Sequence, residues 1–308
     1  MSLERARSRG QARRLGRALC VALGCLGVLL ADSGQARGIP YGELSDPAVQ
    51  RCDALNWSPR HAAAAACYRA LGGEGPAAAA EGAWALGELA RANELFRTAA
   101  AARPNDAGVR RRWAELYIDS HQPQQAQALF REALLRDARD SYARIGAASV
   151  LDGQFAIEAQ AQLDAALSEP TAPTGARLRG LLLKARAALE EADADTARAL
   201  LQQATVLADS GHWPHLELDA LQAALAQLQN QDDAPWVQRA LREDPAYGEA
   251  YALPAQIADI RWRDAEAVAL YRQALAIEPT LWSARRALAD CLLRQGQLAA
   301  GRAMLESA

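Results

Sequence analysis

Residues 107–138 read AGVRRRWAELYIDSHQPQQAQALFREALLRDA and carry the clearest structural signal in the chain. In its second half, Ala126 is followed by Phe130 four residues later and by Ala133 after three more. Spacings of four and three residues place side chains on one face of an α-helix. Small residues on that face let a neighbouring helix approach closely, and the bulky residue between them fills the gap. The stretch therefore predicts a helix packed tightly against a second helix.

The same small–bulky–small triplet recurs along the chain. The first residues of successive full copies lie 34, 33, 38 and 70 residues apart. Proline follows the triplet by five residues at Pro104, Pro245 and Pro279, where its missing N–H ends a helix. A period near 34 residues predicts stacked helical hairpins, in which a first helix and a turn precede each triplet-bearing second helix. The full copies are Ala92–Phe96–Ala99, Ala126–Phe130–Ala133, Ala159–Leu163–Ala166, Ala197–Leu201–Ala204 and Ala267–Tyr271–Ala274, with weaker copies at Asp233 and Gly301.

Composition and charge narrow the class of protein. Hydrophobic residues make up 51% of the chain, but only 7 Trp, 7 Tyr and 3 Phe are present, so small and aliphatic side chains dominate. Such a chain favours closely packed helices over sheets. The 34 basic residues are balanced by 37 acidic ones, which excludes a globally basic nucleic-acid-binding protein.

These residues resemble the tetratricopeptide repeat family, whose second helices carry the same triplet and closing proline. The best matches are residues 107–138 and 248–279. The resemblance covers residues 73–308 as a repeat domain, after a linker and a first hairpin in residues 37–72. It implies an all-α, right-handed superhelical solenoid of stacked antiparallel helix hairpins.

The chain departs from the family pattern in three places. Asp233 stands where alanine is expected, in a second helix that looks short. Pro254 lies inside a first helix, where we expect a kink. The last second helix stops at Ala308 without a closing proline, so we expect an incomplete last repeat with a partly exposed apolar edge. The side chains expected at that edge are Leu293, Leu298 and Leu305.

Residues 1–36 have the pattern of a secretory signal peptide. Six arginines precede an apolar run at residues 18–31, and small residues at Gly34 and Ala36 mark a cleavage site. Removing this segment changes the formal net charge from −3 to −7. We therefore expect a protein exported to a bacterial periplasm or secreted, with membrane contact only through an uncleaved leader. An uncleaved anchor and lipidation at Cys25 stay open as alternatives.

Cysteine usage fits an oxidising compartment. Cys52, Cys67 and Cys291 remain after removal of the leader. Cys52 and Cys67 lie on the two arms of the first predicted hairpin, where a disulfide would staple an exposed terminal hairpin. The two cysteines lie at unequal distances from the turn, so a missed pairing is the alternative.

No motif for catalysis is present, neither a phosphate-binding glycine loop nor an H-E-x-x-H or G-x-S-x-G pattern. The only close histidine pair, His212 and His215, is more typical of a polar loop than of a metal site. Asp193 and Asp195, like Asp232 and Asp233, fall at helix starts, where aspartate caps free N–H groups. We expect no enzyme activity, metal or cofactor.

The resemblance also implies where a ligand binds, because the family's first helices line a concave groove. The family's groove positions fall on arginines in the middle of this chain, and on the acidic residues Glu249 and Asp259 in the sixth repeat. Arginine side chains hold carboxylates through paired hydrogen bonds, so we expect an acidic or extended peptide. A solvated face of mixed charge is the alternative. The groove residues are Arg111, Glu115, Arg144, Arg179 and Arg186, with Leu182 and Leu189 offering apolar contact between them.

The function that follows is a non-catalytic, exported scaffold that binds a protein or peptide. The chain also faintly resembles the amino-terminal repeat region of secreted bacterial proteins that carry a metallopeptidase-like domain. That resemblance implies the alternative, a docking or regulatory region of a larger secreted enzyme.

Overall fold

The computed structural model describes residues 47–57, 61–151 and 156–306. Within these ranges the chain forms sixteen α-helices and one turn of 3-10 helix, and no strand. The helices are α2 (Pro47–Trp57), α3 (His61–Ala70), η2 (Leu71–Gly73), α4 (Pro76–Ala85), α5 (Leu89–Ala102), α6 (Ala107–Asp119), α7 (Pro123–Arg136), α8 (Ser141–Ser149), α9 (Ala156–Ser168), α10 (Thr174–Glu190), α11 (Ala194–Gly211), α12 (Leu216–Leu228), α13 (Ala234–Glu243), α14 (Glu249–Ile260), α15 (Asp264–Ile277), α16 (Trp282–Arg294) and α17 (Leu298–Glu306). The predicted leader lies outside the described residues.

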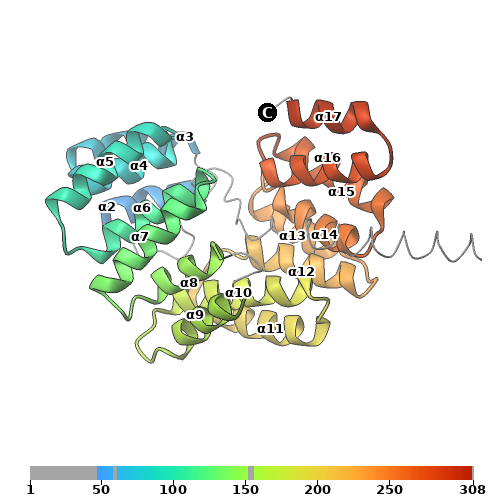
Figure 1. The fold of residues 1–308 in the computed structure, drawn as a ribbon, viewed down its shortest axis with the longest axis horizontal. Helices are drawn as coiled ribbons and strands as arrows, with labels where there is room; N and C mark the ends of the chain where they lie inside the picture. Colours follow the sequence, from blue (N-terminus) through green and yellow to red (C-terminus); the bar gives the residue numbers. More distant parts are fainter. Residues whose placement is uncertain (1–46, 58–60, 152–155, 307–308) are drawn as a thin grey trace, which may run out of the picture.

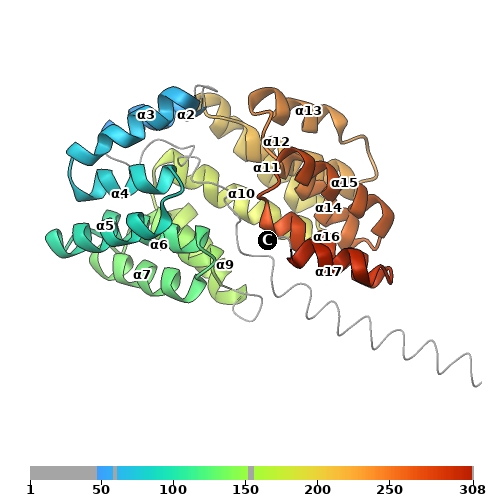
Figure 2. The ribbon, with the colours of Figure 1, turned by 90° about the horizontal axis from the view of Figure 1, so that it is seen from above.

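Consecutive helices pair as hairpins, from α2–α3 to α16–α17. Figure 1 shows these hairpins following one another around an arc, with α2–α7 on one side, α8–α11 at the base and α12–α17 on the other side. Seen from above in Figure 2, α10 runs between the N-terminal and C-terminal hairpins. The predicted all-α, right-handed superhelical solenoid is confirmed. No helix among the described residues is long and apolar enough to span a membrane.

The repeated triplet forms the core of the hairpins, as its spacing predicted. In α7, Ala126, Phe130 and Ala133 are completely buried. The bulky members Phe96, Leu201 and Tyr271 are at most 1% exposed and pack against the first helices on either side. Burying a large apolar side chain contributes about 1.5–3 kcal/mol, so each triplet anchors its hairpin to its neighbours.

Each fully described turn between a first and a second helix is closed in the same way. The N–H group just after the turn residue bonds to the carbonyl five residues earlier, as in Gln122 to Tyr117 and Arg263 to Ala258. This is the Schellman motif, which needs a residue with left-handed backbone at the turn. The residues in that conformation are Gly87, His121, Ala192, Asn230, Trp262 and Gly296.

Aspartates begin several helices, and their side chains accept hydrogen bonds from free N–H groups. Asp193 accepts from the N–H of Thr196 at 3.0 Å, which confirms its predicted capping role. Asp233 precedes α13 without a side-chain cap, and Asp232 accepts from the N–H of Ala234 instead.

The irregular sixth and seventh hairpins pack differently from the others. The short α13 leaves α12 and α14, two first helices, in extensive direct contact. Small residues such as Ala223 and Ala250 allow this close approach. Pro254 stands inside α14, which continues as one helix to Ile260.

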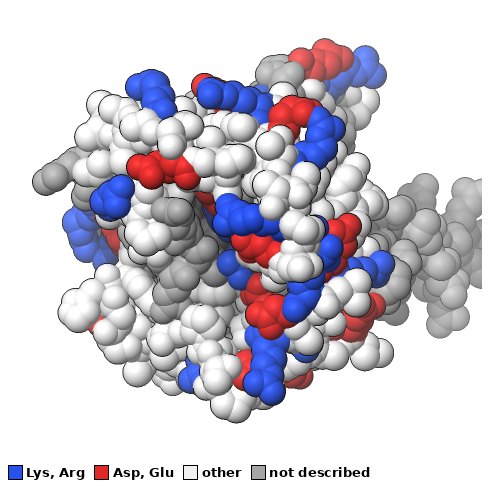
Figure 3. All heavy atoms as spheres, turned by 90° about the vertical axis from the view of Figure 1, so that its left-hand side faces the viewer, with Lys and Arg blue, Asp and Glu red and all other residues white. Residues whose placement is uncertain are grey.

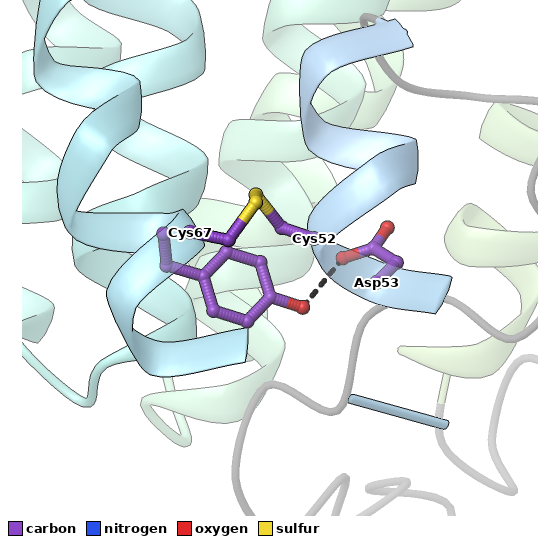
Figure 4. The surroundings of a disulfide bond; sticks show 4 residues. Cys52, Asp53 and Cys67 are labelled. Carbon is purple, nitrogen blue, oxygen red and sulfur yellow. Dashed lines mark hydrogen bonds between the residues drawn. A yellow bond between two sulfur atoms is a disulfide. The ribbon is translucent and has the colours of Figure 1, made fainter. Parts of the chain in front are cut away.

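A disulfide joins the two helices of the first hairpin. The Cα atoms of Cys52 in α2 and Cys67 in α3 lie 5.3 Å apart, within the range that a disulfide requires. Beside this bond, the Tyr68 hydroxyl donates a 2.7 Å hydrogen bond to the carboxylate of Asp53 (Figure 4). Cys291 is a buried free thiol, and burial raises its pKa to about 12. The hairpin is therefore held by a covalent and a polar link side by side.

Candidate ligand-binding face

The first helices of the hairpins line the inner side of the superhelix. Neighbouring first helices contact each other along the series α6, α8, α10, α12, α14 and α16, whereas second helices do not pack on one another to a comparable extent. Elements that touch from repeat to repeat lie at the smaller radius of a curved solenoid. The inner face is therefore made by these first helices.

A buried ion-pair network occupies the N-terminal part of this face. Arg112 in α6 donates two hydrogen bonds, of 2.7 and 2.6 Å, to the carboxylate of Glu81 in α4, and a third to Glu115. The Arg112 guanidinium also lies 4.5 Å from the centre of the Trp84 ring. Both Arg112 and Glu81 have side chains only 9% exposed, so this bidentate pair is a fixed part of the fold.

Arg179 extends this network across the superhelix. From α10 it donates a 2.9 Å hydrogen bond to Glu115 in α6, 64 residues earlier. Burial would raise the pKa of Glu115, but Arg112 and Arg179 outweigh it and lower the pKa. The Arg179 side chain is still 25% exposed. Arg179 is therefore both a structural partner and an accessible cation.

Arg186 sits two turns further along α10 and faces the C-terminal hairpins. Its guanidinium lies 3.6 Å from Glu217 in α12 and 3.6 Å from Glu249 in α14. Both distances exceed the hydrogen-bond range, so these are loose ion pairs. Glu190, one turn beyond Arg186, has a buried carboxylate oxygen without a hydrogen bond, and burial raises its pKa to about 7.

The structure separates the other two predicted arginines from this pair. Arg111 is 8% exposed and donates a 2.6 Å hydrogen bond to Asp140, which caps α8. Arg144 bonds to the carbonyl of Ala138 and to Gln162 in the second helix α9, so it points away from the inner face. Neither side chain joins Arg179 and Arg186.

The predicted apolar contacts are wrong for a simple packing reason. Leu182 and Leu189 are 1% and 2% exposed and belong to the core between α10, α11 and α12. They lie on the side of α10 that packs against neighbouring helices, so no ligand in the groove reaches them. The part of the predicted site that keeps exposed surface is thus Arg179, at 25%, and to a lesser extent Arg186, at 12%, with Glu115 buried behind Arg179.

Two carboxyls that the sequence reasoning missed lie at the N-terminal end of the network. Asp119, at the end of α6, accepts a 2.7 Å hydrogen bond from the Trp84 indole, and burial raises its pKa to about 8. Burial likewise raises the pKa of Asp53 to about 6. Asp119 follows Glu115 by four residues, a helical spacing that signals a shared face.

The described residues hold no group of three or more His, Cys, Asp or Glu side chains arranged for a metal ion. His212 ends α11 with left-handed backbone, and the His215 ring nitrogen lies 3.3 Å from Asp209. On the side of the molecule shown in Figure 3, basic and acidic side chains are interspersed, without a patch of one sign.

Comparisons with known proteins agree with this geometry. A family model described as "Tetratricopeptide repeat" matches residues 83–149 and 265–308. No curated protein matches the chain. The metallopeptidase resemblance stays a prediction.

Two solved structures share the fold at 14% identity each. The first is a chain of the APC/C hetero-tetramer Cut9–Hcn1, with a TM-score of 0.55. The match covers 82% of the present chain and 47% of the Cut9–Hcn1 chain, so the present chain spans less than half of that chain's length. A tetratricopeptide repeat protein from Parabacteroides merdae has a TM-score of 0.50, with 83% of this chain covering 100% of that one. The tetratricopeptide repeat model thus matches two segments of the chain, and the eight stacked hairpins of the described residues share the fold of these solved structures.

Proposed function

We propose that this chain is a non-catalytic, exported scaffold that binds a protein or peptide against its inner face. Stacked helical repeats form extended concave surfaces suited to such partners. The observation that carries the proposal is the pair Arg179 and Arg186 on α10. They are seven residues apart, which places them on the same side of the helix about 10 Å apart along its axis.

We propose that the partner presents acidic side chains to this pair. Arg179 keeps 25% of its side chain exposed, and Arg186 has only loose ion pairs at 3.6 Å. A partner carboxylate would gain charge-assisted hydrogen bonds from N–H groups that Glu217 and Glu249 do not reach. A partner whose carboxylates are spaced by about two helical turns would engage both arginines.

Export is supported by the signal pattern of residues 1–36 and by the Cys52–Cys67 bond, because structural disulfides are rare in reducing compartments. Expression of the full chain in a bacterial host, followed by mass spectrometry of the periplasmic fraction, tests this proposal. We expect a mature chain that begins at Arg37 and is two hydrogens lighter than the reduced form. A full-length, reduced, cytoplasmic chain would refute it.

The binding proposal is tested with residues 37–308 and a fluorescein-labelled hexaglutamate peptide, followed by fluorescence anisotropy. The double variant Arg179→Ala/Arg186→Ala should weaken binding about tenfold or more and flatten its salt dependence. Two matched controls remove an arginine elsewhere: Arg144→Ala on the neighbouring first helix, and Arg198→Ala on the second helix α11. Equal loss in the controls, or tighter binding of hexalysine, would refute the acidic-partner proposal.

A second candidate function rests on the apolar edge of the last hairpin. Leu298 is 65% exposed, and Leu305 and Leu293 are 39% and 36% exposed. Such an edge favours a docking region that packs against a further domain, as in a larger secreted enzyme. Reading the genomic sequence after Ala308 decides between the two. A continued reading frame with an H-E-x-x-H motif would favour the enzyme.

A further inference from the structure

Two ion pairs of α10 connect hairpins that are not neighbours. Arg179 in α10 reaches Glu115 in α6, although the hairpin of α8 and α9 lies between them in the chain. Arg186 reaches Glu249 in α14, although α12 lies between them. In Figures 1 and 2, α10 stands between the two arms of the arc. Each pair therefore links α10 to a different arm.

The intervening helix α8 explains how the first contact is possible. It has only nine residues, most of them small, and all except Arg144 are buried. Gly146 makes room for the Phe130 ring, which lies 2.3 Å from the position that a Cβ would occupy. Because α8 is short and carries mostly small side chains, α6 and α10 approach each other on the inner side, within the reach of one arginine side chain.

Contacts that skip a repeat have a mechanical consequence. In a solenoid each hairpin packs only on its neighbours, so small rotations at successive interfaces add up to the curvature. A contact between hairpins two positions apart fixes the sum of two such rotations. We infer that Arg179 and Arg186 are struts that set the curvature of the superhelix, and that weakening them opens it at α10.

The struts are more exposed to solvent ions than the buried pair of Arg112 and Glu81 in the N-terminal arm. The side chains of Arg112 and Glu81 are both 9% exposed, and their carboxylate–guanidinium contact is bidentate. In the first strut, the Arg179 side chain is 25% exposed. In the second, Arg186 and Glu249 are 12% and 16% exposed, and Glu217, which also pairs with Arg186, is 33% exposed. Salt screens exposed pairs far more than buried ones. Raising the salt concentration should therefore release the struts while each arm keeps its structure.

Removing the struts should also leave the arms folded. Without Arg179, Glu115 still accepts a hydrogen bond from Arg112, so no unpaired buried charge results. Without Arg186, Glu249 keeps the hydrogen bond from the Tyr247 hydroxyl, and Glu217 is exposed enough to be hydrated. The double variant Arg179→Gln/Arg186→Gln is thus a test of curvature and not of folding.

The experiment measures the distance between the arms without any ligand. Spin labels or dyes are attached to Arg91→Cys on α5 and Arg302→Cys on α17, two exposed positions on opposite arms. Cys291 is buried and Cys52–Cys67 is oxidised, so neither competes for the label. In the labelled chain, the distance should increase between about 0.1 M and about 1 M NaCl, over which the Debye length falls from about 10 Å to about 3 Å.

The variants give the matched comparison. Arg179→Gln/Arg186→Gln should already show the longer distance at low salt and no further response. Arg179→Lys/Arg186→Lys keeps both charges and should stay close to the native distance, whereas Arg198→Gln, which breaks a pair within α11, should behave as the native chain. A native distance in the folded Gln variant would overturn the inference. If that variant fails to fold, an unchanged distance across the salt titration of the native chain would overturn it.

This test is independent of the proposed function, because no partner is added. Loss of hexaglutamate binding without a change of curvature would leave the scaffold proposal intact and remove the struts. A change of curvature without any peptide binding would do the reverse.

Discussion

The Cys52–Cys67 bond gives the sharpest test of how stability is distributed along this solenoid. It closes a loop with a sequence separation of 15 residues in the first of the described hairpins. Closing a loop of this length stabilises a folded state by about 3 kcal/mol through the entropy of the unfolded chain. We therefore expect Cys52→Ser/Cys67→Ser to destabilise the first hairpin by that amount.

The effect should be local, because each hairpin of a solenoid contacts only its neighbours. A loss of about 3 kcal/mol corresponds to an increase of roughly a hundredfold in the open population of α2 and α3. The open population of helices α10–α14, which lie several interfaces away, should not change. The hydrogen bond from Tyr68 to Asp53 remains in the variant, so α2 keeps part of its contact with α3.

Hydrogen exchange followed by mass spectrometry measures both parts of this prediction. Peptides covering residues 47–70 should exchange about a hundredfold faster in the variant, or after reduction with a phosphine, while peptides from α10–α14 keep their native rates. Cys291→Ser, which removes a cysteine outside the loop, is the control for loss of a thiol. Unchanged protection of α2, or an equal loss of protection along the whole chain, would contradict the argument.

Three further predictions concern other parts of the molecule. Burial raises the pKa of Asp119 to about 8, so the folded chain holds this proton more tightly than the unfolded chain. The folded chain therefore loses stability as the pH rises from about 4 to about 8. Asp119→Asn should flatten that loss and raise the free energy of unfolding at pH 8.5 by about 1–2 kcal/mol, as measured by urea titration. Gly146→Ala should destabilise the fourth hairpin by about 1–3 kcal/mol, since its Cβ would meet the Phe130 ring, whereas Gly72→Ala meets nothing within 4 Å and should leave the melting temperature nearly unchanged. Leu298→Gln/Leu305→Gln should reduce self-association of residues 37–308 in sedimentation velocity. A native chain that stays monomeric at high concentration would contradict association through these exposed leucines.

The sequence was sufficient for the fold because its signal is repeated. One triplet such as Ala126–Phe130–Ala133 is weak, but copies near a 34-residue period fix helix, turn and packing face together, and the buried Phe96 and Tyr271 follow from it. The turns were harder to predict. Gly87 and Gly296 adopt the left-handed backbone conformation, which glycine favours. His121, Ala192 and Trp262 adopt the same conformation, although their side chains do not favour it.

The candidate site was predicted only in part, because family positions specify a face but not what a side chain meets there. Arg179 and Arg186 lie on the inner face, whereas Arg144 on the shorter α8 bonds to its own hairpin. The leucines failed for a different reason. On a 17-residue helix that is packed on several sides, a position three residues from Arg179, such as Leu182, is already in the core.

The pairing of opposite charges across the superhelix is the property that sequence reasoning could least provide. Glu249 in α14 and Arg186 in α10 are separated by two hairpin boundaries, and no local spacing relates them. Their proximity depends on the curvature accumulated over α10, α12 and α14, which is itself set by residues as small as Ala223 and Ala250. The position of an arginine in the sequence therefore does not show which carboxylate of its own chain it meets on the inner face. The same guanidinium that would receive a partner's carboxylate already balances a carboxylate of its own chain, so binding and curvature share one set of ion pairs.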